Sequence, residues 1–138
     1  MQKSHFQFSS PKLLDFQYSY NKKDEKGDRY NLNTSVECKR NDERKRAEVL
    51  VTINTQNNKD LPCSFSITMC ACFTWDESID DPEKFLRYNA PALLIGYMRP
   101  IIASVTAFSP AGSFDLPFID FTNKISDEAM IGEPAPED

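Results

Sequence analysis

The stretch CSFSITMCACFTW, Cys63 to Trp75, carries the strongest indication of the fold class of this chain. Its odd-numbered side chains are all apolar, and its even-numbered side chains are serine, threonine or cysteine. A period of two sends successive side chains to opposite faces of a β-strand. One face is therefore predicted to be covered and the other to be wet, which is typical of an antiparallel sheet. The unbroken alternation predicts a strand over the whole stretch.

Three earlier stretches alternate in the same way. They are LDFQYSYN (residues 14–21), YNLNTSVEC (30–38) and EVLVTIN (48–54). The polar segments between the four stretches are short enough to be turns. We therefore expect a four-stranded antiparallel meander.

The next segment, NAPALLIGYMRPIIASVTAF (residues 89–108), carries a single charge, Arg99. A helix that is apolar nearly all round must be buried on several sides. One layer of sheet covers only one of them, so we expect a second subunit to cover another. The segment is barely long enough to cross a membrane and contains a charge and two prolines, so burial in protein is the better interpretation. No membrane insertion is expected.

Local signals predict where this helical region begins and bends. Asp81 is a helix-capping residue, and Pro82 suits a first helical position. Asn89 is expected to cap the main helix afresh. The ring of Pro100 would clash with the carbonyl of Gly96, four residues earlier, which predicts a kink between them.

Length and composition predict a single domain over residues 1–126, followed by an acidic, disordered tail at residues 127–138. The net charge of -5 and the pI near 4.9 argue against nucleic-acid binding. A basic cluster at residues 39–46 is interrupted by Asp42 and Glu43 and is interpreted as a hairpin tip. The first ten residues contain no apolar leader, and the four cysteines are expected to be reduced, so we expect a cytoplasmic protein.

The residues of enzyme sites are scarce. A Ser/His or Cys/His catalytic pair would have to use His5, because it is the single histidine. Cys70 and Cys72 share one strand face, but Cys63 points to the other, which is a poor geometry for zinc. Asp80 and its acidic neighbours are interpreted as a solvated edge rather than a cation site. We therefore expect no enzyme activity, no metal and no cofactor.

Two motifs resemble those of the SecB-type protein-export chaperones. The segment PALLIGYMR is similar to the Pro-x-x-Leu-x-x-Tyr-x-Arg signature of that family's long helix, with Pro91, Leu94, Tyr97 and Arg99 at the four positions. The later segment LPFIDF, residues 116–121, is similar to the family's apolar crossover loop. Strands, helix and loop also follow the family's order.

The resemblance implies a SecB-like α+β fold in which an apolar crossover loop follows the helix, and a homotetramer built as a dimer of dimers. It implies a holdase that keeps unfolded polypeptides in apolar grooves and delivers them to the translocation ATPase SecA. The expected oligomer interface is Leu94, Tyr97, Met98, Ile101, Ile102 and Val105. The expected client groove is Phe114, Leu116, Phe118, Ile119 and Phe121, faced by Phe73, Trp75, Tyr18 and Tyr20, with part of these aromatics in the core. Asp76 and Glu77 are the acidic candidates for contact with SecA.

The chain also departs from the family. Phe118 stands where the family usually has proline, and the final helix is reduced to TNKISDEAM, residues 122–130. Two alternatives therefore stay open: a chaperone dedicated to one partner, for example an antitoxin, and an assembly module whose groove one protein fills. A small enzyme or ligand carrier on an α+β sheet is the third.

Overall fold

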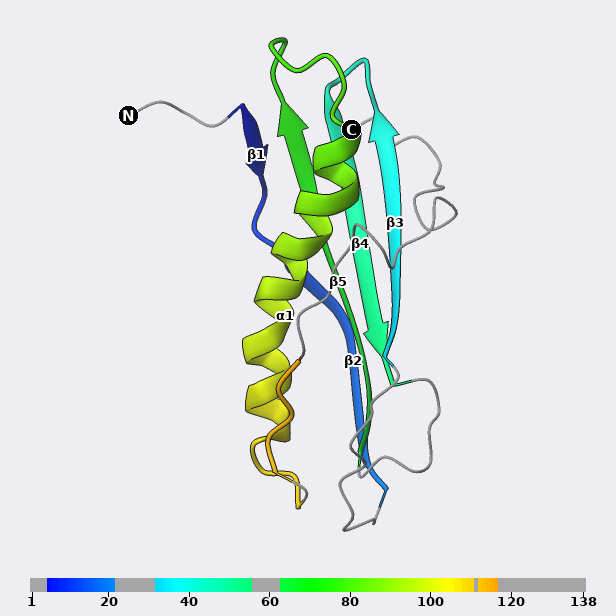
Figure 1. The fold of residues 1–138 in the computed structure, drawn as a ribbon, viewed down its shortest axis with the longest axis vertical. Coiled ribbons are helices and arrows are strands. Elements are labelled where there is room, and N and C mark those ends of the chain that lie inside the picture. Colours follow the sequence, from blue (N-terminus) through cyan, green and yellow to red (C-terminus); the bar gives the residue numbers. More distant parts are fainter. Residues whose placement is uncertain (1–4, 22–31, 56–62, 111, 117–138) are drawn as a thin grey trace, which may run out of the picture.

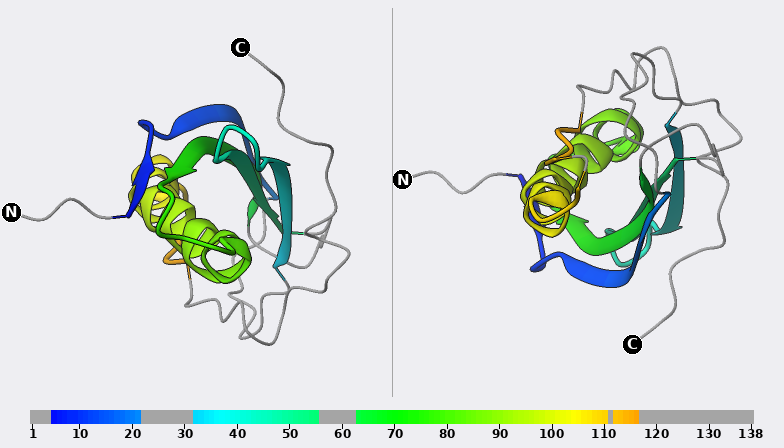
Figure 2. Two further views of the ribbon diagram at one scale, coloured as in Figure 1. Left: turned by 90° about the horizontal axis from the view of Figure 1, so that it is seen from above. Right: turned by 90° about the horizontal axis from the view of Figure 1, so that it is seen from below.

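The computed structural model describes residues 5–21, 32–55, 63–110 and 112–116. The elements are the strands β1 (Phe6–Phe8), β2 (Lys12–Tyr20), β3 (Asn33–Asn41), β4 (Arg46–Asn54) and β5 (Cys63–Trp75), the π-helical turn η1 (Phe85–Asn89) and the helix α1 (Ala90–Thr106). They form an α+β fold in which α1 lies against one face of an antiparallel sheet, over β4 and β5 (Figure 1). The end-on views show that the sheet is strongly curved and that α1 runs along its concave side (Figure 2).

The sheet has five strands, which corrects the predicted four-stranded meander. β3, β4 and β5 are consecutive neighbours, as a meander requires. β2 instead lies on the far edge of β5, and the added strand β1 pairs with the last three residues of the same edge, Phe73 to Trp75. β5 is therefore the central strand, which explains why its alternation is the longest in the sequence.

Burial follows the predicted alternation along β5. Every odd-numbered side chain from Cys63 to Trp75 is buried, and every even-numbered one is half-buried or exposed. β4 shows the same pattern, and the inner faces of both strands form one core with Leu86, Leu94, Met98 and Ile102 of the helical region. The basic cluster forms the β3–β4 turn as expected, with Lys45 in the left-handed region at φ 52°.

The helical region begins at the predicted residues, but no newly capped helix begins at Asn89. The Glu83 backbone N–H donates to Asp81 Oδ1 at 3.0 Å, so Asp81 caps the first turn ahead of Pro82. Asn89 has helical dihedrals and no capping hydrogen bond, so the expected fresh cap is wrong. The helix continues through Gly96 and Pro100, and a bend there stays a prediction. No helix among the described residues is long and apolar enough to cross a membrane.

Candidate functional site

A hollow of about 650 Å³, lined largely by apolar residues, lies between α1 and the corner that joins β1 to β2. We call it the corner groove; its lining residues are Phe8, Ser10, Pro11, Leu13, Met69, Tyr97 and Ile101. Met69 is buried beneath it, whereas Phe8, Leu13 and Tyr97 are 41%, 48% and 44% exposed. Large apolar side chains gathered around a hollow are typical of a surface that binds another polypeptide.

A β-bulge in β2 places Leu13 in the lining of the corner groove. β2 and β5 pair as Leu13↔Met69 and then as Asp15↔Thr68, so Leu14 is an extra residue in the ladder. Because of this shift, Leu13 lies on the inner face together with Met69. Leu14 is 55% exposed and does not line the groove. The sequence pattern had placed Leu14 on the apolar face, and the bulge corrects that register.

The corner itself is fixed by two hydrogen bonds between Ser9 and the main chain of Cys72. The Ser9 N–H donates to the Cys72 carbonyl at 2.9 Å, and the Cys72 N–H donates to Ser9 Oγ at 3.0 Å. Pro11 follows, and its fixed φ favours the turn into β2. The chain is therefore held on β5 at the point where β1 ends.

The apolar surface continues from the groove along α1. Tyr97, Ile101 and Val105 are each four residues apart, which places them on one side of α1, and Phe108 follows in the turn after α1 ends at Thr106. Phe108 is 95% exposed and Val105 is 41% exposed, while Ile101 is half-buried. We call these four residues the α1 stripe.

The predicted oligomer interface divides into two sets. Leu94, Met98 and Ile102 are fully buried against the chain's own sheet, so they cannot contact another subunit. This corrects the prediction for these residues, because the curved sheet covers more of the helix than a flat layer would. Tyr97, Ile101 and Val105 remain on the surface.

Several predicted groove residues are core residues instead. Phe73, Trp75, Phe114 and Leu116 are buried and belong to the hydrophobic core. Phe114 packs edge-on to Phe65 at 5.1 Å between ring centroids, and an Arg99 guanidinium N–H donates to the Leu116 carbonyl at 2.5 Å. The segment at residues 112–116 is therefore packed onto the fold.

The remaining groove residues differ in position. Tyr18 and Tyr20 are half-buried on the inner face of β2, opposite Phe65 and Cys63. Phe118, Ile119 and Phe121 lie outside the described residues, as does the predicted tail at residues 127–138.

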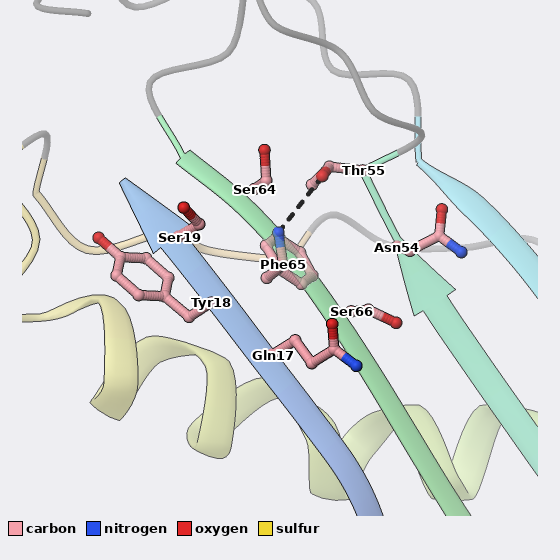
Figure 3. Close-up of a pocket in the computed structure, with 8 residues that line it drawn as sticks. All are labelled: Gln17, Tyr18, Ser19, Asn54, Thr55, Ser64, Phe65 and Ser66. Carbon is pink, nitrogen blue, oxygen red and sulfur yellow. Dashed lines mark hydrogen bonds between the residues drawn. The ribbon is translucent and has the colours of Figure 1, made fainter. Parts of the chain in front are cut away.

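A second hollow, of about 390 Å³, lies where β2, β4 and β5 meet (Figure 3). It is lined by Gln17, Tyr18, Ser19, Asn54, Thr55, Ser64, Phe65 and Ser66. Thr55 Oγ1 accepts a hydrogen bond from the Phe65 N–H at 3.3 Å and joins the two strand ends. These described lining residues offer hydroxyl and amide groups but no charge, so they provide hydrogen bonds without an acid, a base or a metal ligand.

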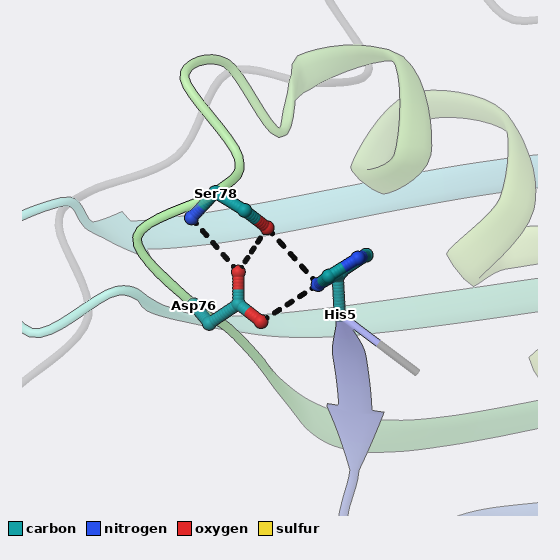
Figure 4. Close-up of polar contacts among 3 residues, drawn as sticks. All are labelled: His5, Asp76 and Ser78. Carbon is teal, nitrogen blue, oxygen red and sulfur yellow. Dashed lines mark hydrogen bonds and ion pairs between the residues drawn. The ribbon is translucent and has the colours of Figure 1, made fainter. Parts of the chain in front are cut away.

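His5, Asp76 and Ser78 form a polar cluster at the outer end of β1 (Figure 4). Asp76 Oδ2 lies 2.8 Å and Ser78 Oγ 3.0 Å from the same ring nitrogen, His5 Nδ1. In a catalytic triad the two ring nitrogens contact different partners, so this cluster lacks that geometry. Hydrogen bonds from Ser78 and then His5 lower the pKa of the Asp76 carboxyl to about 2.

Asp76 and Glu77, the two acidic candidates, are both exposed at the end of β5. Asp76 is engaged by His5, and Glu77 Oε1 lies 3.5 Å from Lys45 Nζ. Both carboxylates are thus already near basic groups of the same chain.

The four cysteines are free thiols, and burial raises the pKa of Cys38 to about 11. Within the described part of the chain, no group of three or more histidine, cysteine or acidic side chains is placed to hold a metal ion.

Sequence reasoning missed Phe8 and Leu13. Phe6 and Phe8 do alternate in HFQF, residues 5–8, which is a signal for a short strand. No local pattern marks the bulge that brings Leu13 to the same hollow.

No family model matches this sequence, and no curated protein matches it. Among solved structures, it is similar to the Rv1957 SecB-like chaperone of Mycobacterium tuberculosis, solved in complex with a ChAD peptide from the Rv1956 HigA1 antitoxin. That likeness has a TM-score of 0.66 at 16% identity and covers 83% of this chain and 91% of the other. A Streptococcus agalactiae protein of unknown function matches with a TM-score of 0.50 at 13% identity, covering 82% and 97%. At these identities the likeness is one of fold.

Proposed function

We propose that this protein is a SecB-like chaperone that binds polypeptide segments in the corner groove. The observation that carries the proposal is the corner groove with its partly exposed apolar side chains Phe8, Leu13 and Tyr97, on an otherwise polar, acidic chain. The fold supports it, since a chain with this architecture has been solved as a SecB-like chaperone with a bound antitoxin peptide.

Binding in this proposal depends on apolar contact. Burying apolar surface contributes roughly 25 cal/mol per Å², without a requirement for particular partner side chains. Aromatic and leucine side chains around a hollow accept clients of many sequences, whereas Asp15 and the acidic end of β5 keep the free protein soluble. The reaction is binding and release, with no covalent step.

The finer parts of the function are also proposals. We propose a homo-oligomer, up to a dimer of dimers, that forms through the Val105–Phe108 end of the α1 stripe, because Tyr97 and Ile101 line the groove. Unfolded clients on the way to export through SecA are one class of cargo. A single dedicated client is the second candidate, favoured by the antitoxin peptide bound to the Mycobacterium tuberculosis chaperone.

Two adjacent leucines provide a matched test of the groove. Leu13 lines it and Leu14 does not, yet both are exposed on β2. We expect Leu13→Ser to weaken binding of a reduced, alkylated, permanently unfolded polypeptide about tenfold, since removing a leucine contact of this size costs about 1.4 kcal/mol. Leu14→Ser should bind like the parent protein. Fluorescence anisotropy with the labelled client measures both.

Equal binding by the parent and both variants would contradict the groove assignment. Absence of any binding by the parent protein would contradict a general holdase. Competition between several unrelated unfolded chains then separates the two candidates, because a general holdase lets each displace the others and a dedicated chaperone does not.

A further inference from the structure

Strand β1 occupies part of the edge of β5 that β2 leaves open. It pairs in the register Phe6↔Trp75, Gln7↔Thr74 and Phe8↔Phe73, antiparallel to β5. Beyond it, the Asp76 N–H donates to the His5 carbonyl at 3.2 Å, which extends the pairing by one residue. In Figure 1, β1 stands apart from β2 as a separate short arrow beside the end of β5.

The two phenylalanines of β1 cover aromatic side chains. Phe6 stacks on Phe85 with ring centroids 3.8 Å apart and planes 9° from parallel. Phe8 lies 5.8 Å from Phe73, and Phe73 in turn meets Phe85 edge-on at 5.8 Å. We use the name aromatic edge site for Phe85 together with the edge of β5 from Phe73 to Trp75, with which β1 pairs and which β2 does not cover.

β1 is held weakly in comparison with β2. It has three residues against nine, so far fewer residues pair with β5, although neither strand has a fully buried side chain. Its outer end is attached through the Asp76 N–H to His5 carbonyl hydrogen bond and the exposed His5–Asp76 side-chain contact, and exposed contacts of this kind contribute little to stability. Its inner end is fixed at Ser9, which makes Ser9 a pivot. Short, exposed elements of this kind open locally at low cost.

We infer that β1 is an internal occupant of the aromatic edge site, and that a client segment displaces it. The class of segment is set by what β1 presents: an extended chain with two aromatic side chains, two residues apart, that pairs antiparallel with β5. This rests on the proposed function and deepens it. It also gives Phe73 and Trp75 a place in client binding, because displacement of β1 uncovers the strand edge that bears them.

The displacement joins the two parts of the candidate surface. Phe8 belongs both to β1 and to the corner groove, and its ring lies 6.5 Å from that of Tyr97. When β1 leaves, the groove loses this wall and becomes continuous with the edge of β5. A bound segment then receives main-chain hydrogen bonds from β5 and aromatic contacts from Phe73 and Phe85.

The test uses the peptide HFQFSS, residues 5–10 of the chain, as a labelled probe added in trans. HSQSSS is the control peptide. In the full chain, Phe6→Ser removes the stack on Phe85 and should raise the affinity for HFQFSS at least fivefold, since an aromatic pair contributes about 1 kcal/mol. Gln7→Ser, on the outward face of β1, is the control variant and should bind like the parent.

A reversible lock provides the opposite perturbation. Gln7 and Thr74 are both exposed and directly opposite, at a spacing suited to a disulfide. The locked variant carries Gln7→Cys and Thr74→Cys in a background of Cys70→Ser and Cys72→Ser. When oxidised, this variant should bind neither HFQFSS nor an unfolded client, and it should regain both activities on reduction. This comparison is decisive even if Phe6→Ser does not fold.

Equal peptide binding in the oxidised and reduced states would overturn the inference. So would a client that binds the locked protein as well as the reduced one, although the proposed chaperone function would then stand. If the released edge binds HFQFSS but no variant binds an unfolded polypeptide, the strand site stands and the chaperone function fails.

Discussion

Truncating Leu94 tests whether α1 is packed on its own sheet or on another subunit. Leu94 is fully buried within one chain, in contact with the core. Leu→Ala changes at such sites cost about 2–5 kcal/mol, because the lost contacts leave a cavity. For a chain of 138 residues, each kcal/mol corresponds to roughly 3 °C in Tm. A loss of about 3 kcal/mol therefore predicts a Tm lower by about 10 °C.

The assay is thermal unfolding by far-UV circular dichroism at several protein concentrations, with particle mass from light scattering. Ser104→Ala is the control on the same helix, because Ser104 is exposed and is not assigned to the groove or to the α1 stripe. It should shift Tm by about 3 °C or less. If Leu94→Ala leaves Tm unchanged but reduces the particle mass, Leu94 lies at a subunit interface and the packing described above is wrong. A larger loss in Ser104→Ala than in Leu94→Ala would refute it as well.

Two further predictions concern polar contacts. Thr106 is buried, and its Oγ1 accepts a hydrogen bond from the Phe114 N–H at 2.8 Å. Thr106→Val should therefore lower the free energy of unfolding in urea by about 1–3 kcal/mol, whereas Thr106→Ser should not. Equal stability of the two variants would contradict the role of this hydroxyl. The lowered pKa of Asp76 means that its contribution to stability is complete above the ordinary pKa of 3.8 and is lost as pH falls toward about 2. The urea midpoints of the parent and Asp76→Asn should therefore converge between pH 5 and pH 2, and a constant difference would count against this contact.

The sheet was largely predictable because its strands carry their own signal. β5 has the predicted bounds, and the Asp81 cap appears where the sequence places it. The position of β2 was not predictable, since the same alternation suits a strand beside β3 or beside β5. β1 was missed because three residues give too short a period to stand out.

The candidate site was less predictable than the fold. Alternation shows that Phe73 and Trp75 share the covered face of β5, but not which segments cover them. Phe73 is buried where β1 and the helical region meet over it, and Leu13 reaches the corner groove because Leu14 is a bulge. Both outcomes depend on segments that are distant in the sequence.

Local sequence patterns are sufficient to assign the local order of this protein: which residues alternate, where the helix begins, and that one helix carries more apolar surface than a single sheet layer covers. Which part of that surface is inside depends on how the folded elements pack. The curved sheet buries Leu94, Met98 and Ile102 and leaves Tyr97, Val105 and Phe108 exposed. Periodicity is a property of neighbouring residues, whereas burial depends on the packing of whole elements, which no local pattern contains.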